Sequence, residues 1–234
     1  MADAAMAGRD GRDPLVAATA NERAVHAKAI GDLARADALN RRALALALDR
    51  VPRDSVELAT LLHNRGGIEH ARGRWAAAED PARRGLALRR ARLGDAHPDV
   101  AADEVALAAI LDGRGHRDEA RRLLERALPR LERARGPEHL DVAVACGNLG
   151  AVRHRQGDPA AALALHERAL AIKCRRLGPR HPSTALTRAN AAAARVALGL
   201  EGGEPGAPDL RASRSWPSWW WSGSRSRASW ATPT

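Results

Sequence analysis

Aromatic side chains are almost missing from most of this chain of 234 residues. There is no Tyr and no Phe, and five of the six Trp follow residue 215. Trp75 is therefore the only Trp in the first 215 positions, so a core there must be built from Ala, Leu, Val and Ile. Alanine and leucine are strong helix formers. This composition favours closely packed helices.

Lysine is also scarce, and Lys28 and Lys173 are the only two in the sequence. Nearly all of the positive charge behind the net charge of +10 therefore comes from Arg. A basic balance can attract nucleic acid or acidic surfaces. Here the arginines recur along the chain and do not gather in one run. Together with the abundant Ala, Gly and Pro, they are typical of GC-rich coding, which favours a compositional explanation over nucleic-acid binding.

Two cysteines, Cys146 and Cys174, are too few for a disulfide framework, and no CxxC metal motif is present. No apolar run reaches about 18 residues, the length that would indicate a membrane-spanning helix. The beginning, MADAAMAGRDGRD, has early acids and no apolar stretch, so no signal peptide is predicted. We expect an intracellular, cytoplasmic protein that does not insert into a membrane.

Catalytic patterns are missing as well. His166-Glu167 and Asp103-Glu104 are adjacent in sequence, so on a helix the two side chains of each pair point in different directions. Gly113-Arg114-Gly115 lies between two expected helices, whereas a phosphate-binding glycine loop follows a strand. The sequence predicts no enzyme, no cofactor and no metal site.

What the chain does contain is a repeat of 42 residues. Glycines recur at Gly31, Gly73, Gly115, Gly157 and Gly199. Five residues after the first four of them stand Ala36, Ala78, Ala120 and Ala162. Leucines follow at Leu44, Leu86, Leu128 and Leu170, each two residues after Arg42, Arg84, Arg126 or Arg168. Several residue types sharing one period indicate an array of helical hairpins.

The period divides the chain into segments. Residues 1–13 are small and charged and are predicted to be disordered. The array is predicted over 14–199, with repeats at about 14–53, 54–95, 96–137 and 138–179 and a half repeat at 180–199. Residues 200–234 form a Trp-, Ser- and Arg-rich tail that is also predicted to be disordered. The tail is either a docking segment or, as we favour from its abrupt change of composition, a shifted frame or unselected extension.

Local signals predict where the helices begin and end. The recurring glycine can end a first helix in the left-handed conformation. In the fourth repeat Asp158 is a candidate N-cap, and Pro159 occupies the preferred first helical position. His97, His139 and His181 recur once per repeat, which places them too far apart to share a zinc ion. We therefore expect these histidines to be structural residues of the joints.

These elements resemble the tetratricopeptide repeat, in the 42-residue form found in kinesin light chains. The family's small residue of the first helix (helix A) matches Ala24, Gly66, Ala108, Gly150 and Ala192. Its R-A-L element in the second helix (helix B) matches 42–44, 126–128 and 168–170, and its HPDVA element resembles 97–101. The resemblance implies an all-α fold, an α-α superhelix.

The chain departs from the family pattern at three kinds of position. Arg65 stands where Leu107 and Leu149 predict a buried residue. Gly85 replaces the alanine of the R-A-L element. The aromatic residue expected two positions after the recurring glycine is kept only at Trp75.

The resemblance implies a function in protein binding, with helix A lining a concave groove. An asparagine there can bond both the N–H and the C=O of an extended peptide. The candidate peptide-binding residues are Asn64, Asn148, Asn190, His70, His154 and Arg155. His63 and Asp112 belong to the same expected groove.

The leading hypothesis is therefore a non-catalytic scaffold that binds a protein or peptide. An alternative is an adaptor or regulatory subunit of a larger complex, like a kinesin light chain, although no long heptad segment precedes the repeats in this sequence. A third is a basic nucleic-acid-binding protein, against which the lack of interleaved aromatic residues counts. The sequence names neither the partner nor the oligomeric state.

Overall fold

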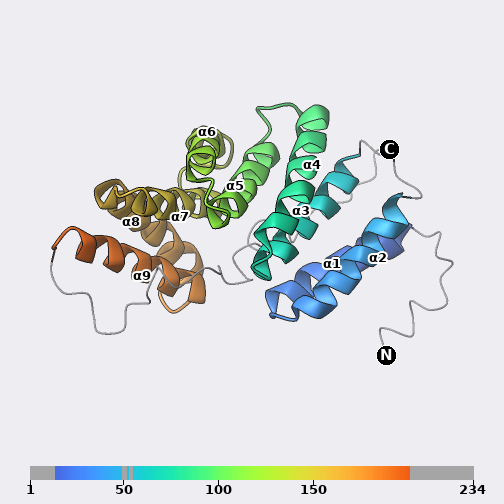
Figure 1. Cartoon of the computed structure of the whole chain (residues 1–234), viewed down its shortest axis with the longest axis horizontal. Helices are drawn as coiled ribbons and strands as arrows, with labels where there is room; N and C mark the ends of the chain where they lie inside the picture. Colours follow the sequence, from blue (N-terminus) through green and yellow to red (C-terminus); the bar gives the residue numbers. More distant parts are fainter. Residues whose placement is uncertain (1–13, 49–51, 53–54, 201–234) are drawn as a thin grey trace.

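The computed structural model describes residues 14–48, 52 and 55–200, and all regular structure within these ranges is helical (Figure 1). Its helices are α1 (Pro14–Ala29), α2 (Leu33–Leu48), α3 (Val56–Ala71), α4 (Trp75–Leu93), α5 (Pro98–Gly113), α6 (Arg117–Arg135), α7 (Leu140–Arg155), α8 (Pro159–Leu177) and α9 (Pro182–Ala197). The all-α prediction is confirmed.

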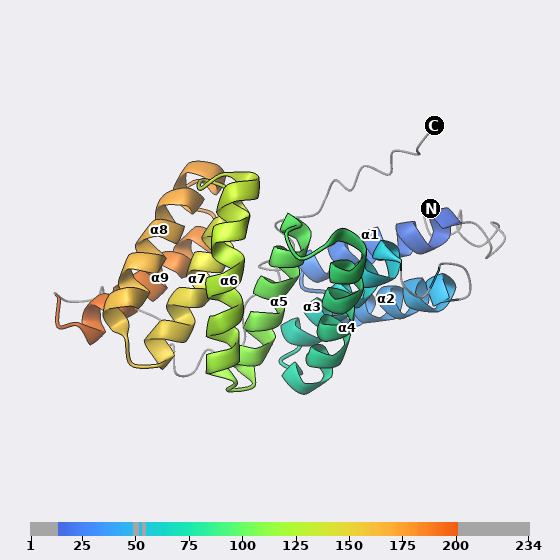
Figure 2. The ribbon, with the colours of Figure 1, turned by 90° about the horizontal axis from the view of Figure 1, so that it is seen from above.

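The helices form an arch of stacked hairpins. Each helix packs against the next in the chain, and each odd-numbered helix also contacts the following odd-numbered helix. Figure 1 shows the odd-numbered helices on the inner side of the arch and the even-numbered helices on the outer side, and Figure 2 shows the same stacking from above. The period of 42 residues predicted the hairpins, and this superhelix, with helix A of each repeat facing inward, is the one that the resemblance to the tetratricopeptide repeat implied.

The turn inside each hairpin follows the predicted local chemistry. In the fourth repeat Gly157 has a φ of +84°, a conformation that side chains other than glycine rarely adopt. The Asp158 carboxylate accepts a hydrogen bond of 3.0 Å from the N–H of Ala161, and Pro159 is the first helical residue. The predicted cap is confirmed, and it allows the chain to reverse within a short turn.

The joints between repeats use histidine as a helix cap. His97, His139 and His181 each precede an odd-numbered helix, and the Nδ1 atom of each accepts a hydrogen bond of 3.1 Å from the backbone N–H two residues later. These bonds satisfy N–H groups that a helix start leaves without an intrahelical partner. The expected structural role is confirmed, and N-capping is its physical form. In the described part of the chain no group of three or more His, Cys, Asp or Glu could hold a metal ion.

The interior is built from small residues at the closest approaches and from a few large aliphatic residues. The recurring alanines Ala36, Ala78, Ala120 and Ala162 are all 0% exposed. The R-A-L leucines are less buried than expected, since Leu128 is only half-buried and packs at the edge of the core. Leu124 and Leu131 of the same helix are 0% exposed, and they fill the space between hairpins. The alanine of R-A-L, not its leucine, faces the centre.

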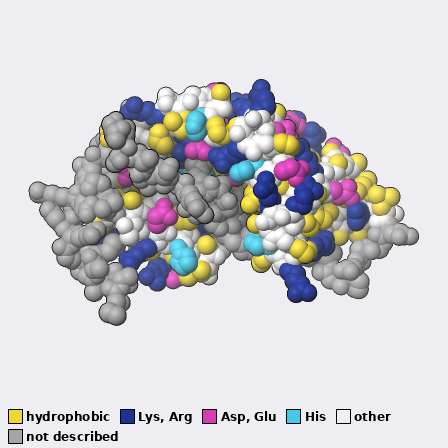
Figure 3. Space-filling view, turned by 180° about the vertical axis from the view of Figure 1, so that it is seen from behind, with side chains coloured by type: hydrophobic (Ala, Val, Ile, Leu, Met, Phe, Trp, Pro, Cys, Tyr) yellow, Lys and Arg dark blue, Asp and Glu magenta, His cyan; other side chains and the backbone are white. Residues whose placement is uncertain are grey.

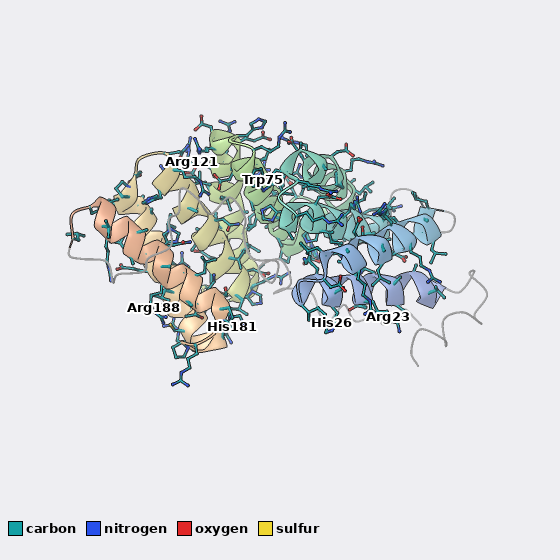
Figure 4. All side chains as sticks on the ribbon, turned by 60° about the horizontal axis from the view of Figure 1, so that its bottom comes forward. Arg23, His26, Trp75, Arg121, His181 and Arg188 are labelled. Carbon is teal, nitrogen blue, oxygen red and sulfur yellow. The ribbon has the colours of Figure 1, made fainter. Side chains whose placement is uncertain are left out.

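Two glycines inside helices, one of them the departure at Gly85, have a packing reason. A Cβ at Gly85 would lie 2.9 Å from the backbone oxygen of Ala59, so glycine lets α4 approach α3 more closely than alanine would. A Cβ at Gly113 would lie 2.8 Å from the indole ring of Trp75. Figure 4 shows Trp75 in the middle of the array, where its ring covers the last turn of α5.

The array ends on an unpaired helix within the described residues. α9 packs on α8 and has no second helix after it up to Leu200. Ala192, which takes the small-residue position, is therefore half-buried, whereas Ala24 and Ala108 are 0% exposed. The predictions for residues 1–13 and 201–234 lie outside the described residues.

Candidate peptide-binding face

The inner face is formed by the odd-numbered helices, and its middle is apolar and small. Ala102 and Val144 occupy one repeat position, and both are partly exposed. Ala109 and Ala151 occupy another, at 3% and 7% exposure. Because these side chains are short, a ligand's own side chains could approach the helix backbones closely. This arrangement suits an extended segment that carries apolar side chains.

The predicted asparagines lie between successive inner helices. The Nδ2 of Asn64 donates to the Oδ1 of Asn21 at 2.7 Å, which joins α3 to α1. The Nδ2 of Asn148 donates to the backbone oxygen of Val105 at 3.5 Å, which joins α7 to α5. Asn148 and Asn190 are 2% and 5% exposed, much less than a groove-lining side chain was expected to be. Their Oδ1 atoms are buried and have no hydrogen-bond partner.

His70 is placed differently from its predicted role. It is 3% exposed, and burial followed by the nearby positive charge of Lys28 lowers its pKa to about 4. A neutral, buried imidazole cannot set a charge preference for a ligand at neutral pH. Its position corresponds to Lys28, Asp112, His154 and Val196 in the other repeats, so the residues at this position vary in charge and polarity.

Arg155 and Asp112 form an ion pair across two repeats. The Nε of Arg155 donates to Oδ1 of Asp112 at 3.0 Å, and its Nη2 donates to Oδ2, so the pair is bidentate. The Asp112 side chain is 4% exposed and that of Arg155 is 28% exposed. Because a bidentate pair holds the guanidinium fork in place, Arg155 is positioned chiefly by Asp112. His154 beside it is half-buried.

A buried charge network that the sequence patterns did not predict crosses the joint between α4 and α5. The Nε of Arg89 donates to Oδ2 of Asp103 at 2.6 Å, and both side chains are 2% exposed. The Nδ1 of His63 lies 2.7 Å from the other carboxylate oxygen. His63 was expected in the groove, and its side chain is 11% exposed, so it belongs mainly to this network.

A second network explains Arg65, which stands at a position predicted to be buried and apolar. Arg65, Arg41 and Arg72 all pair with Asp37 of α2, a side chain that is 2% exposed. Burial by itself would raise the pKa of Asp37, but the hydrogen bonds from these three arginines more than offset it and hold the pKa below its ordinary value. The long Arg65 side chain thus reaches a carboxylate that a leucine could not pair with.

Arginines of the R-A-L element pair with acids. Arg84 lies 3.6 Å from the Asp80 carboxylate, and Arg168 lies 2.5 Å from that of Glu132. Arg126 bonds to Glu104. Figure 3 accordingly shows basic and acidic side chains interspersed on the face seen from behind, without a continuous basic stripe. This distribution does not resemble a track for a nucleic-acid backbone.

The buried thiol of Cys146 does not form a nucleophilic site. Burial raises its pKa to about 11, while the charge of Arg168 acts in the opposite direction. A protonated thiol at 0% exposure is neither a good nucleophile nor accessible. Cys146 and Cys174 are both free.

A membrane-spanning role finds no support among the described helices. None of them combines the length and the apolar character that crossing a bilayer requires.

Comparisons with known proteins agree with this architecture. A family model of the tetratricopeptide repeat matches residues 57–133, 101–175 and 143–200. No match was found among the curated proteins. The crystal structure of BtubC (BKLC) from P. vanneervenii is similar, with 26% identity, a TM-score of 0.63, and coverage of 76% of this chain and 70% of that chain.

Two further crystal structures share the fold. Both contain nearly identical TPR-like repeats attributed to a kinesin light chain of Podosopora anserina, and each is 22% identical and covers 80% of this chain. In the form with a single substitution the match includes 88% of the solved chain, with a TM-score of 0.64. In the other form it includes 89% of the solved chain, with a TM-score of 0.63. The family match spans more than half of the sequence and covers the helices from α3 to α9. This chain therefore belongs to the tetratricopeptide repeat family.

Proposed function

We propose that this protein is a non-catalytic scaffold that binds an extended segment of a partner protein on the inner face of its arch. Its fold already indicates a role in protein–protein interaction. The observation that carries the finer proposal is the pair of unpaired amide oxygens, on Asn148 and Asn190, at one repeat position of the inner helices. A buried polar atom without a hydrogen bond costs free energy, so a partner that donates one is favoured.

An extended peptide can supply such donors at regular intervals along its backbone. Its N–H groups would bond the two Oδ1 atoms, and its apolar side chains would lie on the short residues between them, such as Ala102, Val144 and Ala151. Because both asparagines are almost fully covered, their amides must turn toward the inner face on binding. Asn64, His154 and Arg155, which are partly exposed, would contact the same segment at its edges.

The proposal is tested with a peptide selected from a random library for binding to the full chain. The double change Asn148→Ala and Asn190→Ala is expected to weaken binding by roughly tenfold or more, because two hydrogen bonds of about 1 kcal/mol each are lost. The matched control is Arg84→Ala, which removes an exposed side chain from the outer face. Equal affinity of the double variant and the unchanged chain would disprove binding at these asparagines.

A second candidate is an adaptor role, suggested by the similarity to the two crystal structures attributed to a kinesin light chain. Such an adaptor must hold two proteins at once. Two ligands that bind without competing would support this role, and strict competition between all selected ligands would contradict it.

A further inference from the structure

Glu104 of α5 is a fully buried carboxylate surrounded by arginines from two outer helices. Its Oε1 accepts a hydrogen bond of 2.7 Å from Nη2 of Arg90 on α4 and another from Nη2 of Arg126 on α6. Its Oε2 accepts from Nη2 of Arg130, also on α6. The carboxylate is 0% exposed, whereas the side chains of Arg90, Arg126 and Arg130 are 37%, 50% and 12% exposed. The three guanidinium groups therefore form the surface above Glu104.

Positive charge exceeds negative charge at this place. Arg90, Arg126 and Arg130 contribute three positive charges and Glu104 one negative charge. Asp95 adds a second negative charge, at 2.6 Å from Arg90 and 4.0 Å from Arg130, so the three arginines exceed the two carboxylates by one positive charge. Burial lowers the pKa of Arg130. The negative charge of Asp95 raises this pKa, whereas the positive charges of Arg90 and of the exposed Arg133 lower it further. A cluster of this kind is stabilised by one more anion.

The same position in the next repeat shows what a balanced pair looks like. Arg168 corresponds to Arg126, Cys146 corresponds to Glu104, and Glu132 corresponds to Arg90, each 42 residues apart. There Arg168 pairs with Glu132 one to one, at 2.5 Å. The excess of arginine at Glu104 is therefore not a general property of the outer face.

The cluster around Asp37 also has more arginines than carboxylates, but its unmet hydrogen-bonding capacity is of the opposite kind. Both of its carboxylates, Asp37 and Glu69, are 2% exposed, and one oxygen of Glu69 lacks a hydrogen-bond donor. The unmet capacity there is that of an acceptor, which an added anion could not satisfy. At Glu104 both carboxylate oxygens are already bonded, and the excess lies on the donor side.

We propose that Arg90, Arg126 and Arg130 form a second binding site, on the outer face, for a single phosphate monoester carried by a partner protein. A phosphate monoester carries a charge of about −1.5 to −2 at neutral pH, which is enough to neutralise this excess, and guanidinium forks bond its oxygens well. A single group fits better than a nucleic-acid backbone, because Arg84 and Arg168 on the same face are each paired with an acid. That the phosphate belongs to a protein rests on the proposed scaffold function.

The first test uses inorganic phosphate and the full chain. We expect phosphate to raise the melting temperature above that in chloride of the same ionic strength, and titration calorimetry to give a saturable isotherm. Arg126→Gln should weaken phosphate binding by roughly tenfold or more, as expected for a lost charged hydrogen bond. Arg168→Gln, the matched control at the same repeat position, should leave it unchanged. No preference for phosphate over chloride, or equal losses in both variants, would overturn the proposal.

The second test separates a ligand site from an ion network that only stabilises the fold. Glu104→Gln removes the competing carboxylate, so we expect phosphate to bind more tightly and to raise the melting temperature of this variant more than that of the unchanged chain. A purely structural network predicts no such gain from phosphate. If Glu104→Gln does not fold, the comparison of Arg126→Gln with Arg168→Gln still decides the question.

The third test addresses the source of the phosphate. A phosphoserine peptide should bind, and its unphosphorylated form should bind roughly tenfold less or weaker still, as a lost charged contact implies. Binding of inorganic phosphate without any preference for the phosphopeptide would overturn the assignment to a protein partner. The Asn148→Ala and Asn190→Ala variant should keep its phosphate affinity, so failure of the inner-face proposal and failure of this one are distinguished.

Discussion

Arg89 and Asp103 form a buried ion pair of 2.6 Å across the joint between the second and third repeats. The corresponding residues at the other joints are Ala47 and Leu61, Leu131 and Ala145, and Lys173 and Thr187. Leu131 and Ala145 belong to the apolar core, and Nζ of Lys173 donates to Oγ1 of Thr187 at 2.8 Å. This pair of repeat positions thus alternates between apolar and polar contacts from one joint to the next. A long charged side chain occurs only where the facing residue is polar.

Removing one partner of the Arg89–Asp103 pair should be strongly destabilising. Asp103→Ala leaves the Arg89 guanidinium buried without this carboxylate. Its existing hydrogen bond to the neutral Thr60 hydroxyl does not balance the charge. Breaking a buried pair in this way typically costs about 3–5 kcal/mol of unfolding free energy. Urea denaturation of the variant measures the loss.

The double change Arg89→Leu and Asp103→Ala tests the reason for that loss. It copies the apolar pair of the next joint, Leu131 and Ala145. Apolar replacement of a buried ion pair is often neutral or stabilising, so most of the lost stability should return. A double variant as unstable as Asp103→Ala would show that the pair is needed for more than mutual neutralisation.

The stability of the fold should fall in mild acid because of His166. Burial lowers the pKa of this imidazole to about 4, with smaller contributions from His154, Lys173 and Arg155. The unfolded chain, with an ordinary histidine pKa of about 6.5, binds the proton first. Stability contributed by the neutral imidazole is present above about pH 6.5 and is lost as the pH falls toward 4, by about 3 kcal/mol at most.

His166→Leu isolates this effect, since Leu124 occupies the corresponding position of the preceding repeat. The difference in unfolding free energy between the variant and the unchanged chain should be constant above about pH 7 and should grow in favour of the variant below it. Parallel stability curves from neutral pH down to about pH 5 would contradict a buried neutral His166.

The core leucines of α6 should rank by their burial. Leu124→Ala, at a side chain that is 0% exposed, should cost about 2–5 kcal/mol. Leu128→Ala, at the half-buried leucine of the R-A-L element, should cost clearly less, although its place in the sequence pattern suggests otherwise. Thermal unfolding of the two variants compares them directly, and a reversed order would contradict the observed register of α6.

Pro129 lies inside α6, where it removes a backbone hydrogen bond of the helix. Its side chain is exposed, so replacement creates no cavity. Pro129→Ala should raise the melting temperature, because proline is about 3 kcal/mol less favourable than alanine in a helix interior. Pro159→Ala is the control, since Pro159 is the first residue of α8 and should stabilise its helix. A fall in stability for Pro129→Ala would indicate that the proline supports packing.

Local signals in the sequence were sufficient for the helices and the turns. The period of 42, the glycine that begins each turn and the Asp158-Pro159 start depend on residues that are close together in the chain, so the hairpins could be read directly. The helix caps at His97, His139 and His181 could also have been found, because each histidine precedes the start of an inner helix by one residue.

Contacts across repeats were not predictable in the same way. Asn148 appeared from its repeat position to be open to a ligand, yet it packs against α5, 43 residues earlier. Arg65 stood out as a departure from the pattern, yet it pairs with Asp37, 28 residues earlier. In both cases the partner depends on how one hairpin is rotated against the next. The repeat pattern alone does not give that rotation.

The sequence by itself determined the repeat, the helices and their turns, because these follow from helix periodicity and glycine conformation. It also showed which small residues lie in the core. The tertiary structure decided which charged residues are buried together and which remain at the surface. Glu104 and its three arginines come from α4, α5 and α6, and only the stacking of successive hairpins brings their charges to one place.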